Sequence, residues 1–272
     1  MACEHEFKCD VGEPILTTHE ISFSYERHQP ILKSINMSIP AGKICGLFGP
    51  NGSGKSTLFK CCLNFLKPKQ GEVRLFNKPL NQFSPAHLAQ HIAYVPQEHH
   101  QAFPYTVREM VAMGRTPHLR GLPLLTEHDN EIIDHVLKKI GLENIAHQHY
   151  ANLSGGQRQL VLVARAMAQQ ASLIFLDEPT SSLDFANQLL VWEALLPIAQ
   201  EGVGIFICCH DPNHILWFCD DVIIIKEGEL LAQGEAKSTL TQTMLQQLYG
   251  RKIAMKHFDN QAFIYFDNQQ MK

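Results

Sequence analysis

Hydrophobic and polar residues alternate along the first part of the chain with a period of two, which is typical of half-buried β-strands. Two series of apolar positions show the alternation most clearly: Ile21, Phe23 and Tyr25, and then Ile35, Met37 and Ile39. Val73 and Leu75 continue the pattern farther along the chain. The sequence therefore predicts a β-rich N-terminal region.

A strand, a glycine-rich loop and a helix are predicted in that order for residues 43–66. The strand, residues 43–48, is apolar and follows a turn at Pro40-Ala41-Gly42. We expect the helix to run to about Leu66, because Pro68 cannot continue it.

The character of the pattern changes after residue 98. Up to about residue 152, apolar positions recur with helical spacing, and residues 131–140 carry acids early and lysines late, which complements the helix dipole. Later, short continuous apolar runs at 173–176, 203–209 and 222–225 alternate with helical stretches. Such runs are typical of a parallel sheet covered by helices on both faces, so we predict an α/β fold.

Composition narrows the class of protein. The chain has 272 residues, of which 45% are hydrophobic and 18% charged, so it can build a large core. Its formal net charge of −4 argues against a nucleic-acid-binding protein, which needs a basic face. No apolar run approaches the roughly 20 residues of a membrane span, and the polar start lacks the apolar core of a secretory signal. These features favour a soluble protein inside the cell.

The cysteines indicate a reducing environment rather than a disulfide framework. Of the eight, Cys61–Cys62 and Cys208–Cys209 are adjacent pairs inside apolar segments, and Cys45 falls in a predicted strand. We expect them to be buried, reduced thiols. As an alternative for the N-terminal tail, Cys3, His5 and Cys9 form a metal-binding group, although it has too few ligands for a structural site.

The glycine-rich loop matches the phosphate-loop pattern and reads Gly49-Pro50-Asn51-Gly52-Ser53-Gly54-Lys55-Ser56. Its glycines let successive backbone N–H groups converge on phosphate oxygens, and the helix N-terminus adds a partial positive charge. Lys55 is then expected to reach the β- and γ-phosphates, and the Ser56 hydroxyl to coordinate Mg²⁺.

Two carboxylates, Asp177 and Glu178, end the apolar run at 173–176. Open α/β sheets bind ligands at the carboxyl ends of their strands. We expect Asp177 to face the water shell of a metal and Glu178 to polarise an attacking water. Two solvated loop acids are the alternative.

A second anion site is predicted at Leu153-Ser154-Gly155-Gly156-Gln157. Ser154 and Gln157 have the spacing of a capping box that opens a helix over residues 158–168. The two glycines would leave the start of this helix bare, and a bare helix N-terminus binds anions.

These segments, in this order, resemble the nucleotide-binding subunits of ATP-binding-cassette (ABC) transporters from about residue 16 to 250. The resemblance implies a P-loop ATPase with an N-terminal antiparallel β subdomain and an inserted helical subdomain. It also implies a head-to-tail homodimer in which each subunit completes the other's Mg-ATP site. The implied divisions are a tail (1–13), the first part of the core (14–97), a helical subdomain (98–156), the second part of the core (157–249) and an extension (250–272).

The resemblance assigns roles to single residues. Tyr25 resembles the aromatic side chain that stacks on adenine, with a core tyrosine as the alternative. Gln97 resembles the glutamine that meets Mg²⁺, and His210 resembles the switch histidine that contacts the γ-phosphate. Asp184, in Ser182-Leu183-Asp184, is similar to the loop through which the subunits sense each other. The implied catalytic set is Lys55, Gln97, Glu178 and His210; the metal set is Ser56, Gln97 and Asp177; and the nucleotide set is Tyr25, Gly49, Pro50, Asn51, Gly52, Ser53, Gly54, Lys55, Ser56, Thr57, Ser154, Gly155, Gly156, Gln157 and Asp184.

The segments 103–109 and 113–118 are similar to those of importers for iron–siderophore, haem, cobalamin and related metal complexes or oxyanions such as molybdate. This likeness implies a peripheral protein on the cytoplasmic side of the inner membrane, with permease subunits and a periplasmic or surface substrate-binding protein as partners. Residues 103–111 mix aromatic and charged side chains, which suits contact with the permease. Alternatively, these aromatics only pack the helical subdomain.

Two other classes of protein compete with this interpretation. A soluble cassette ATPase that acts on ribosomes or DNA would have tandem cassettes, a long charged coiled-coil insertion or a basic face, and the sequence has none of these. A metal-binding scaffold is suggested only by the 15 histidines, and the intact Lys55, Glu178 and His210 argue against it.

Overall fold

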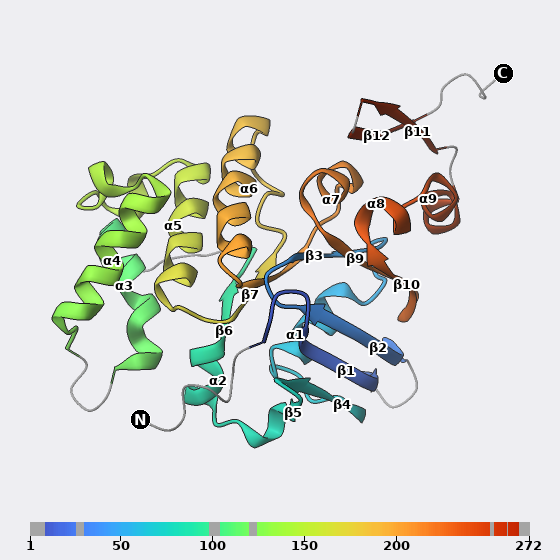
Figure 1. Ribbon diagram of the computed structural model, residues 1–272, viewed down its shortest axis with the longest axis horizontal. Coiled ribbons are helices and arrows are strands. Elements are labelled where there is room, and N and C mark those ends of the chain that lie inside the picture. Colours follow the sequence, from blue (N-terminus) through green and yellow to red (C-terminus); the bar gives the residue numbers. More distant parts are fainter. Residues whose placement is uncertain are drawn as a thin grey trace. The chain divides into compact units, whose positions relative to one another are not determined.

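The computed structural model describes residues 9–25, 30–97, 104–119, 124–250, 253–259 and 261–266. It forms two compact units, one made of residues 1–82 with 206–272 and the other of residues 83–205. Figure 1 colours both units along the sequence. The finer boundaries implied by the family resemblance stay a prediction.

An antiparallel sheet in the first unit confirms the predicted β-rich start. Its strands lie in the order β2-β1-β4-β5, with these bounds: β1 (Pro14–Phe23), β2 (Leu32–Pro40), β4 (Gln70–Leu75) and β5 (Lys78–Pro79). Ile21 lies opposite Ile35, and both are fully buried, so the alternating positions face a core. Tyr25 lies beyond the end of β1.

A parallel pairing holds the core strands of the same unit. The elements of this part are β3 (Ile44–Phe48), α1 (Lys55–Cys62), β8 (Gly204–Cys208, within the unit from Phe206), α7 (Pro212–Phe218), β9 (Asp221–Lys226), β10 (Glu229–Glu235), α8 (Ala236–Thr239) and α9 (Gln242–Tyr249). β3 pairs in parallel with β9, and all five residues of β3 are buried. Phe59 of α1 stacks on Phe206 with their ring centroids 5.1 Å apart, so α1 covers this layer.

The predicted length of the helix after the glycine-rich loop is wrong at its C-terminal end. Helix α1 stops at Cys62, several residues before the expected Leu66. Leu63 is its C-cap, and Asn64 has a left-handed φ of 59°, a conformation that ends a helix. The N–H groups of Phe65 and Leu66 then close a turn on the carbonyl of Lys60.

The second unit contains most of the helices. Its elements are α2 (Pro85–His91), β6 (Ile92–Val95), α3 (Val107–Ala112), the 3₁₀ helix η2 (Met113–His118), α4 (Glu127–Ile140), the 3₁₀ turns η3 (Glu143–Ile145) and η4 (Tyr150–Asn152), α5 (Gly155–Ala168), β7 (Leu173–Asp177) and α6 (Phe185–Gln200). β6 and β7 pair in parallel, with Ile92 opposite Leu173. The predicted helical character of this region is confirmed in its described part.

The segment 113–118, which carried part of the resemblance to importers, connects neighbouring helices through a buried arginine. Arg115 of η2 is buried; its Nε donates to Asp129 at the start of α4 (2.8 Å), and its Nη1 donates to the carbonyl of Ala168 at the end of α5 (2.7 Å). Hydrogen bonds from Thr126 are the main reason that the pKa of Asp129 is far below its usual range, and the Arg115 guanidinium lowers it further. One cation therefore ties three elements together.

The described cysteines confirm the expectation of reduced thiols. All seven are free, and all except Cys9 are buried. Burial raises the pKa of Cys61 to about 11, so this thiol stays protonated near neutral pH. Cys3 and His5, two members of the alternative metal group, lie outside the described residues.

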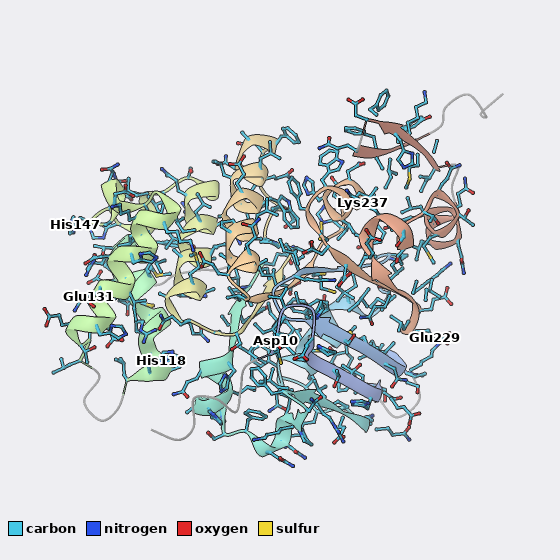
Figure 2. The ribbon with its side chains drawn as sticks, viewed as in Figure 1. Asp10, His118, Glu131, His147, Glu229 and Lys237 are labelled. Atoms are coloured by element: carbon cyan, nitrogen blue, oxygen red, sulfur yellow. The ribbon has the colours of Figure 1, made fainter. Side chains whose placement is uncertain are left out.

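Charged side chains lie on the surface of both units. Figure 2 labels exposed charged side chains, among them Asp10, Glu229 and Lys237 of the first unit and Glu131 of the second. In the described ranges, every helix is too short or too polar to cross a lipid bilayer.

Candidate nucleotide-binding site

The phosphate-loop residues connect β3 to α1, as the sequence predicts. A Cβ atom at Gly49 would lie 2.1 Å from the carbonyl oxygen of Ile225, so the close approach of the loop to β9 requires a glycine there. Gly54 is the N-cap of α1 and offers no side chain to the first N–H groups of the helix. These N–H groups are therefore left for a ligand, the arrangement by which helix N-termini bind phosphate.

The side chains inside the loop suit an anion. Lys55 is only 6% exposed, and its Nζ donates to the carbonyls of Gly49 (2.8 Å) and Pro50 (2.9 Å). The hydroxyl of Ser53 is buried without a hydrogen-bond partner among the described residues. An orphaned buried hydroxyl beside a buried cation is rare unless a further polar group binds there. The loop therefore fits a phosphate group.

Tyr25 lies beside this loop. Its hydroxyl is 3.5 Å from the Thr57 hydroxyl on α1, and its ring makes an edge contact with Phe23 at 5.0 Å. The side chain is 60% exposed, so the alternative of a core tyrosine is wrong. Most of the ring is left for stacking on a planar group.

His210 lies at the carboxyl end of β8 in the same unit. The N–H of Cys209, just before it, donates to the carbonyl of Leu47 on β3 at 3.2 Å. Asp211, just after it, is the N-cap of α7 and accepts from the N–H of Asn213 at 2.8 Å. The histidine is exposed between two anchored neighbours.

A second group of predicted residues meets in the other unit. Asp177 ends β7, and Glu178 follows it with a left-handed φ of 46°, which is strained for a residue with a side chain. Gln97 lies just after β6, and its Nε2 donates to Oε2 of Glu178 at 3.1 Å. Such strain persists only where the surroundings enforce it, and it is frequent at functional sites. Burial, with the Asp177 carboxylate as a further cause, raises the pKa of Tyr94 on the neighbouring strand.

Ser181 is a member of this group that the sequence analysis did not single out. Its hydroxyl donates to the carbonyl of Glu178 at 3.0 Å and lies 3.4 Å from Nε2 of Gln97. It thus holds both the strained turn and the amide that meets the carboxylate. A serine three residues after an acid is a common turn signal, but nothing in the sequence links it to Gln97.

The capping box at the start of α5 is confirmed. The Ser154 hydroxyl accepts from the N–H of Gln157 (3.3 Å), and the Gln157 side chain accepts from the N–H of Ser154 (3.0 Å). The helix begins at Gly155, three residues earlier than predicted. Only Gly155 leaves this helix start open, because Gly156 is buried.

Asn187 of α6 covers Gly156, a contact that the sequence does not predict. A Cβ atom at Gly156 would lie 2.0 Å from Oδ1 of Asn187. The Nδ2 of Asn187 donates to Asp184 (2.8 Å), and the backbone N–H of Asn187 also donates to that carboxylate (2.9 Å). These hydrogen bonds, the backbone one first, lower the pKa of Asp184. The helix start at 154–157 and the loop at 182–184 are therefore packed closely against Asn187 within the unit.

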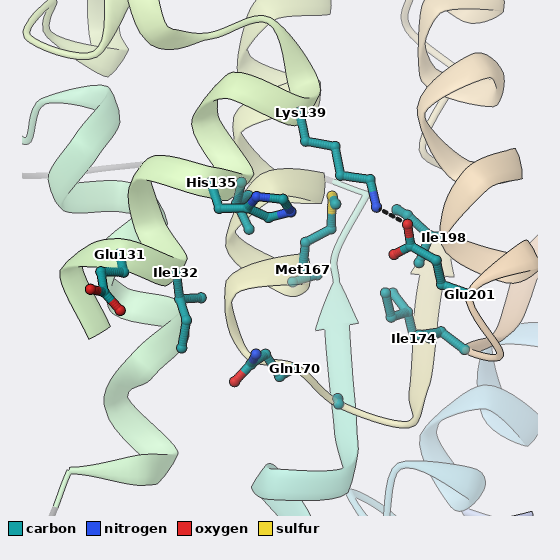
Figure 3. A pocket seen from close by; sticks show the side chains of 13 residues that line it. Glu131, Ile132, His135, Lys139, Met167, Gln170, Ile174, Ile198 and Glu201 are labelled. Atoms are coloured by element: carbon teal, nitrogen blue, oxygen red, sulfur yellow. Dashed lines mark hydrogen bonds and ion pairs between the residues drawn. The ribbon is translucent and has the colours of Figure 1, made fainter. Parts of the chain in front are cut away.

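A cavity of the second unit lies away from these residues. It has a volume of about 440 Å³ and is lined by α4, α5, β7 and α6, with an ion pair between Lys139 and Glu201 at its edge (Figure 3). None of the predicted site residues lines it. The candidate site is therefore defined by the chemistry of the two residue groups and not by this cavity.

Donor chemistry also agrees with a magnesium ion. Each predicted magnesium ligand carries an oxygen atom of the type that Mg²⁺ prefers: Ser56 in the first unit, and Gln97 and Asp177 in the second. Mg²⁺ is usually held by one or two carboxylates together with phosphates and water. Over the described residues, no three His, Cys, Asp or Glu side chains gather as a metal cage.

A phosphate loop, an α/β core and a strand that ends in two carboxylates define a P-loop nucleotide-binding protein. The ABC transporter family model matches residues 32–181, more than half of the chain. The chain therefore belongs to the ABC transporter family and is an ATP-binding subunit that hydrolyses ATP.

Known relatives share most of its length. It is 37% identical to the hemin import ATP-binding protein HmuV of Escherichia coli O157:H7, over 82% of this chain and 87% of that protein. It is also 37% identical to the iron(3+)-hydroxamate import ATP-binding protein FhuC of Bacillus subtilis, over 86% and 87%. A solved metal-chelate type ABC transporter in an inward-facing conformation matches 94% of this chain and 97% of that chain, with a TM-score of 0.80 and 29% identity.

Proposed function

We propose that this chain is the ATPase that powers import of an iron complex, a siderophore or haem, through a partner membrane permease. The observation that carries the proposal is its 37% identity to import ATPases for hemin and for iron hydroxamates over more than four fifths of the chain. Cobalamin and molybdate belong to the wider range of solutes predicted from sequence, and no relative named above favours them. The protein would lie on the cytoplasmic side of the membrane.

The first unit supplies the nucleotide-binding residues in this proposal. Tyr25 stacks on the adenine ring, and the N–H groups of the loop 49–54 bind the phosphates. Lys55 exchanges its bonds to the loop carbonyls for phosphate oxygens, which would leave its positive charge where anionic charge develops. Ser56 contributes an oxygen ligand to Mg²⁺, and Thr57 completes the start of the helix.

The second unit supplies the groups for hydrolysis, together with His210. Glu178 accepts a hydrogen bond from the attacking water and polarises it, and the amide of Gln97 holds that carboxylate in place. Asp177 and Gln97 face Mg²⁺. His210 contacts the γ-phosphate. The ion, when bound, neutralises phosphate charge.

We propose a homodimer because one copy of the chain supplies only part of each nucleotide site. Ser154, Gly155 and Gln157 would bind the nucleotide held by the loop of a second copy, while the buried Gly156 would let the helix start pack against Asn187. Asp184 would report between the copies. Because Asn187 bonds to Asp184 and packs against Gly156, a movement of one of these segments is expected to reach the other. A monomer holding half of each site should turn over slowly, since phosphoryl transfer depends on positioning and charge neutralisation.

The permease is expected to contact the start of the helical segment in the second unit. Phe103 lies outside the described residues. Tyr105 is half-buried, and Arg108 of α3 makes an ion pair with Asp134 of α4 beside a cavity of about 410 Å³.

Because Arg108→Glu would set two carboxylates against each other, Tyr105→Ala is the cleaner test. We expect this variant to bind ATP normally and to lose permease association in a pull-down. Loss of ATP binding as well would favour the alternative that Tyr105 only packs the subdomain.

The substrate is tested by reconstituting the chain with its permease and any substrate-binding protein in vesicles. A ferric hydroxamate or haem should stimulate ATP hydrolysis at least several-fold, whereas cobalamin and molybdate should not. Stimulation by molybdate alone would overturn the iron proposal without affecting the assignment as an ATPase.

The catalytic carboxylate is tested by Glu178→Gln, which is nearly isosteric but cannot accept a proton. We expect ATP binding to persist and turnover to fall by at least about 100-fold. Gel filtration with ATP and Mg²⁺ should then show a trapped dimer. Lys55→Ala should instead lose nucleotide binding. A monomeric Glu178→Gln variant with normal hydrolysis would disprove the role.

A further inference from the structure

The C-terminal hairpin, formed by β11 (Ile253–Phe258) and β12 (Gln261–Phe266), lies against α7 in the first unit (Figure 1). Strand β11 ends at Phe258, β12 begins at Gln261, and the two strands pair in antiparallel register. Nothing in the proposed ATPase chemistry uses this hairpin.

Asn213, near the start of α7, binds the backbone of β12 at two points. Its Oδ1 accepts from the N–H of Ile264 at 2.8 Å, and its Nδ2 donates to the carbonyl of the same residue at 3.3 Å. A side-chain amide that both accepts from and donates to one residue imitates the pairing of a further strand. The position of Asn213 is thereby tied to that of β12.

A second attachment lies one turn farther along α7. The indole Nε1 of Trp217 donates to the carbonyl of Ala262 at 3.0 Å, and its ring makes an edge contact with Phe263 at 5.4 Å. Because Asn213 and Trp217 are four residues apart, they lie on the same face of the helix. That face of α7 is covered by β12, while Ile215 and Leu216 are buried.

The opposite edge of the hairpin is held in the same manner by α9. Gln242 accepts from the N–H of Met255 at 3.1 Å, and Gln246 donates to the carbonyl of Ile253 at 3.0 Å. Side-chain amides thus satisfy both edges of a two-stranded sheet, which by itself is marginally stable. The hairpin is therefore attached to the first unit by hydrogen bonds along both of its edges.

We call the contacts of Asn213 and Trp217 with β12 the clamp on α7. This clamp lies close to His210 along the chain. Asp211 separates His210 from the helix and bonds to the N–H of Asn213, the residue that β12 holds. On the other side, Cys209 is anchored to Leu47. Helix α7 has only seven residues, too few to be stable without tertiary contacts, so its first turn depends on what covers it.

We infer that Asn213 is a positioning residue for His210 and that the C-terminal hairpin is the brace through which it acts. The inference rests on the proposed role of His210 at the γ-phosphate. Loosening the clamp frees the first turn of α7, and with it Asp211 and His210, while the phosphate loop keeps its own bonds. The effect should therefore fall on turnover and not on nucleotide affinity.

The test is Asn213→Ala in the full chain, assayed with permease. We expect kcat to fall about tenfold, with KM for ATP changed by less than about twofold, as for a small displacement of a catalytic group. Hydrogen exchange at the Ile264 amide should become faster, which shows that the clamp has opened. Unchanged exchange, or normal kcat with faster exchange, overturns the inference.

Gln246→Ala is the matched control, because it removes a bond to the hairpin from α9 without touching α7. It should keep kcat within about twofold of the wild type. An equal loss of kcat in both variants would show that any loosening of the hairpin slows the enzyme and would overturn a specific role for Asn213.

A double-mutant cycle with His210→Ala tests whether the effect runs through the histidine. In the His210→Ala background, Asn213→Ala should lower turnover by less than about twofold, because the group that it positions is gone. A full tenfold loss in that background overturns the inference alone. Normal hydrolysis by His210→Ala itself would overturn the proposed role of the histidine and the inference with it.

Discussion

A methyl group at position 156 should destabilise the protein, whereas one at position 155 should not. The new Cβ at Gly156 would lie 2.0 Å from Oδ1 of Asn187, far inside contact distance, while at Gly155 the nearest atom would be Leu183 Cδ2 at 3.5 Å, an ordinary contact. Asn187 can move aside only by giving up its bond to Asp184. Overpacking of this kind costs about 1–3 kcal/mol and a lost hydrogen bond about 1 kcal/mol, against a gain of up to about 1 kcal/mol in helix propensity.

We therefore expect Gly156→Ala to lower the free energy of unfolding by about 2 kcal/mol and Gly155→Ala to change it by less than about 0.5 kcal/mol. Trp192, fully buried on α6, reports unfolding of the second unit by fluorescence in urea when Trp217, the other tryptophan, is replaced by phenylalanine. In an Asn187→Ala background the cost of Gly156→Ala should nearly disappear. An equal cost in that background, or no cost in the wild type, would refute the steric reasoning.

Two further predictions concern ionisable groups, one half-buried and one buried. Burial first, and then His87 and His118, lower the pKa of His91 to about 4, so the unfolded chain takes up this proton before the folded one. The stability that His91 contributes is complete above about pH 6.5 and falls towards pH 4. Urea unfolding at pH 7, 6 and 5 should therefore show that His91→Gln loses less stability on acidification than the wild type. An equal loss in both proteins would contradict the lowered pKa of His91. Arg115→Met should cost about 3–5 kcal/mol, since it leaves Asp129 charged and buried without its guanidinium. A cost below about 1 kcal/mol in urea unfolding would show that the pair contributes little.

Much of the nucleotide site could be predicted from the sequence because its parts are contiguous. The phosphate loop lies between one strand and one helix, and the residues that shape it are neighbours along the chain. The capping box of Ser154 and Gln157 spans a single helical turn, so its hydrogen bonds follow from spacing alone. The period-two and continuous apolar runs likewise predict the two kinds of sheet, since side-chain direction alternates locally along a strand.

Only the tertiary structure shows the contacts that join distant segments. Gln97 meets Glu178 and Ser181 because β6 and β7 are paired, and Asn187 covers Gly156 because α6 packs on α5. Asn213 meets Ile264, 51 residues later in the chain. Asparagine, serine and glutamine have no period or motif that reveals a partner, since a short amide or hydroxyl can bond to any polar group brought near it. The left-handed backbone of Glu178 is hidden for the same reason: the strain is imposed by surroundings that exist only after the chain has folded.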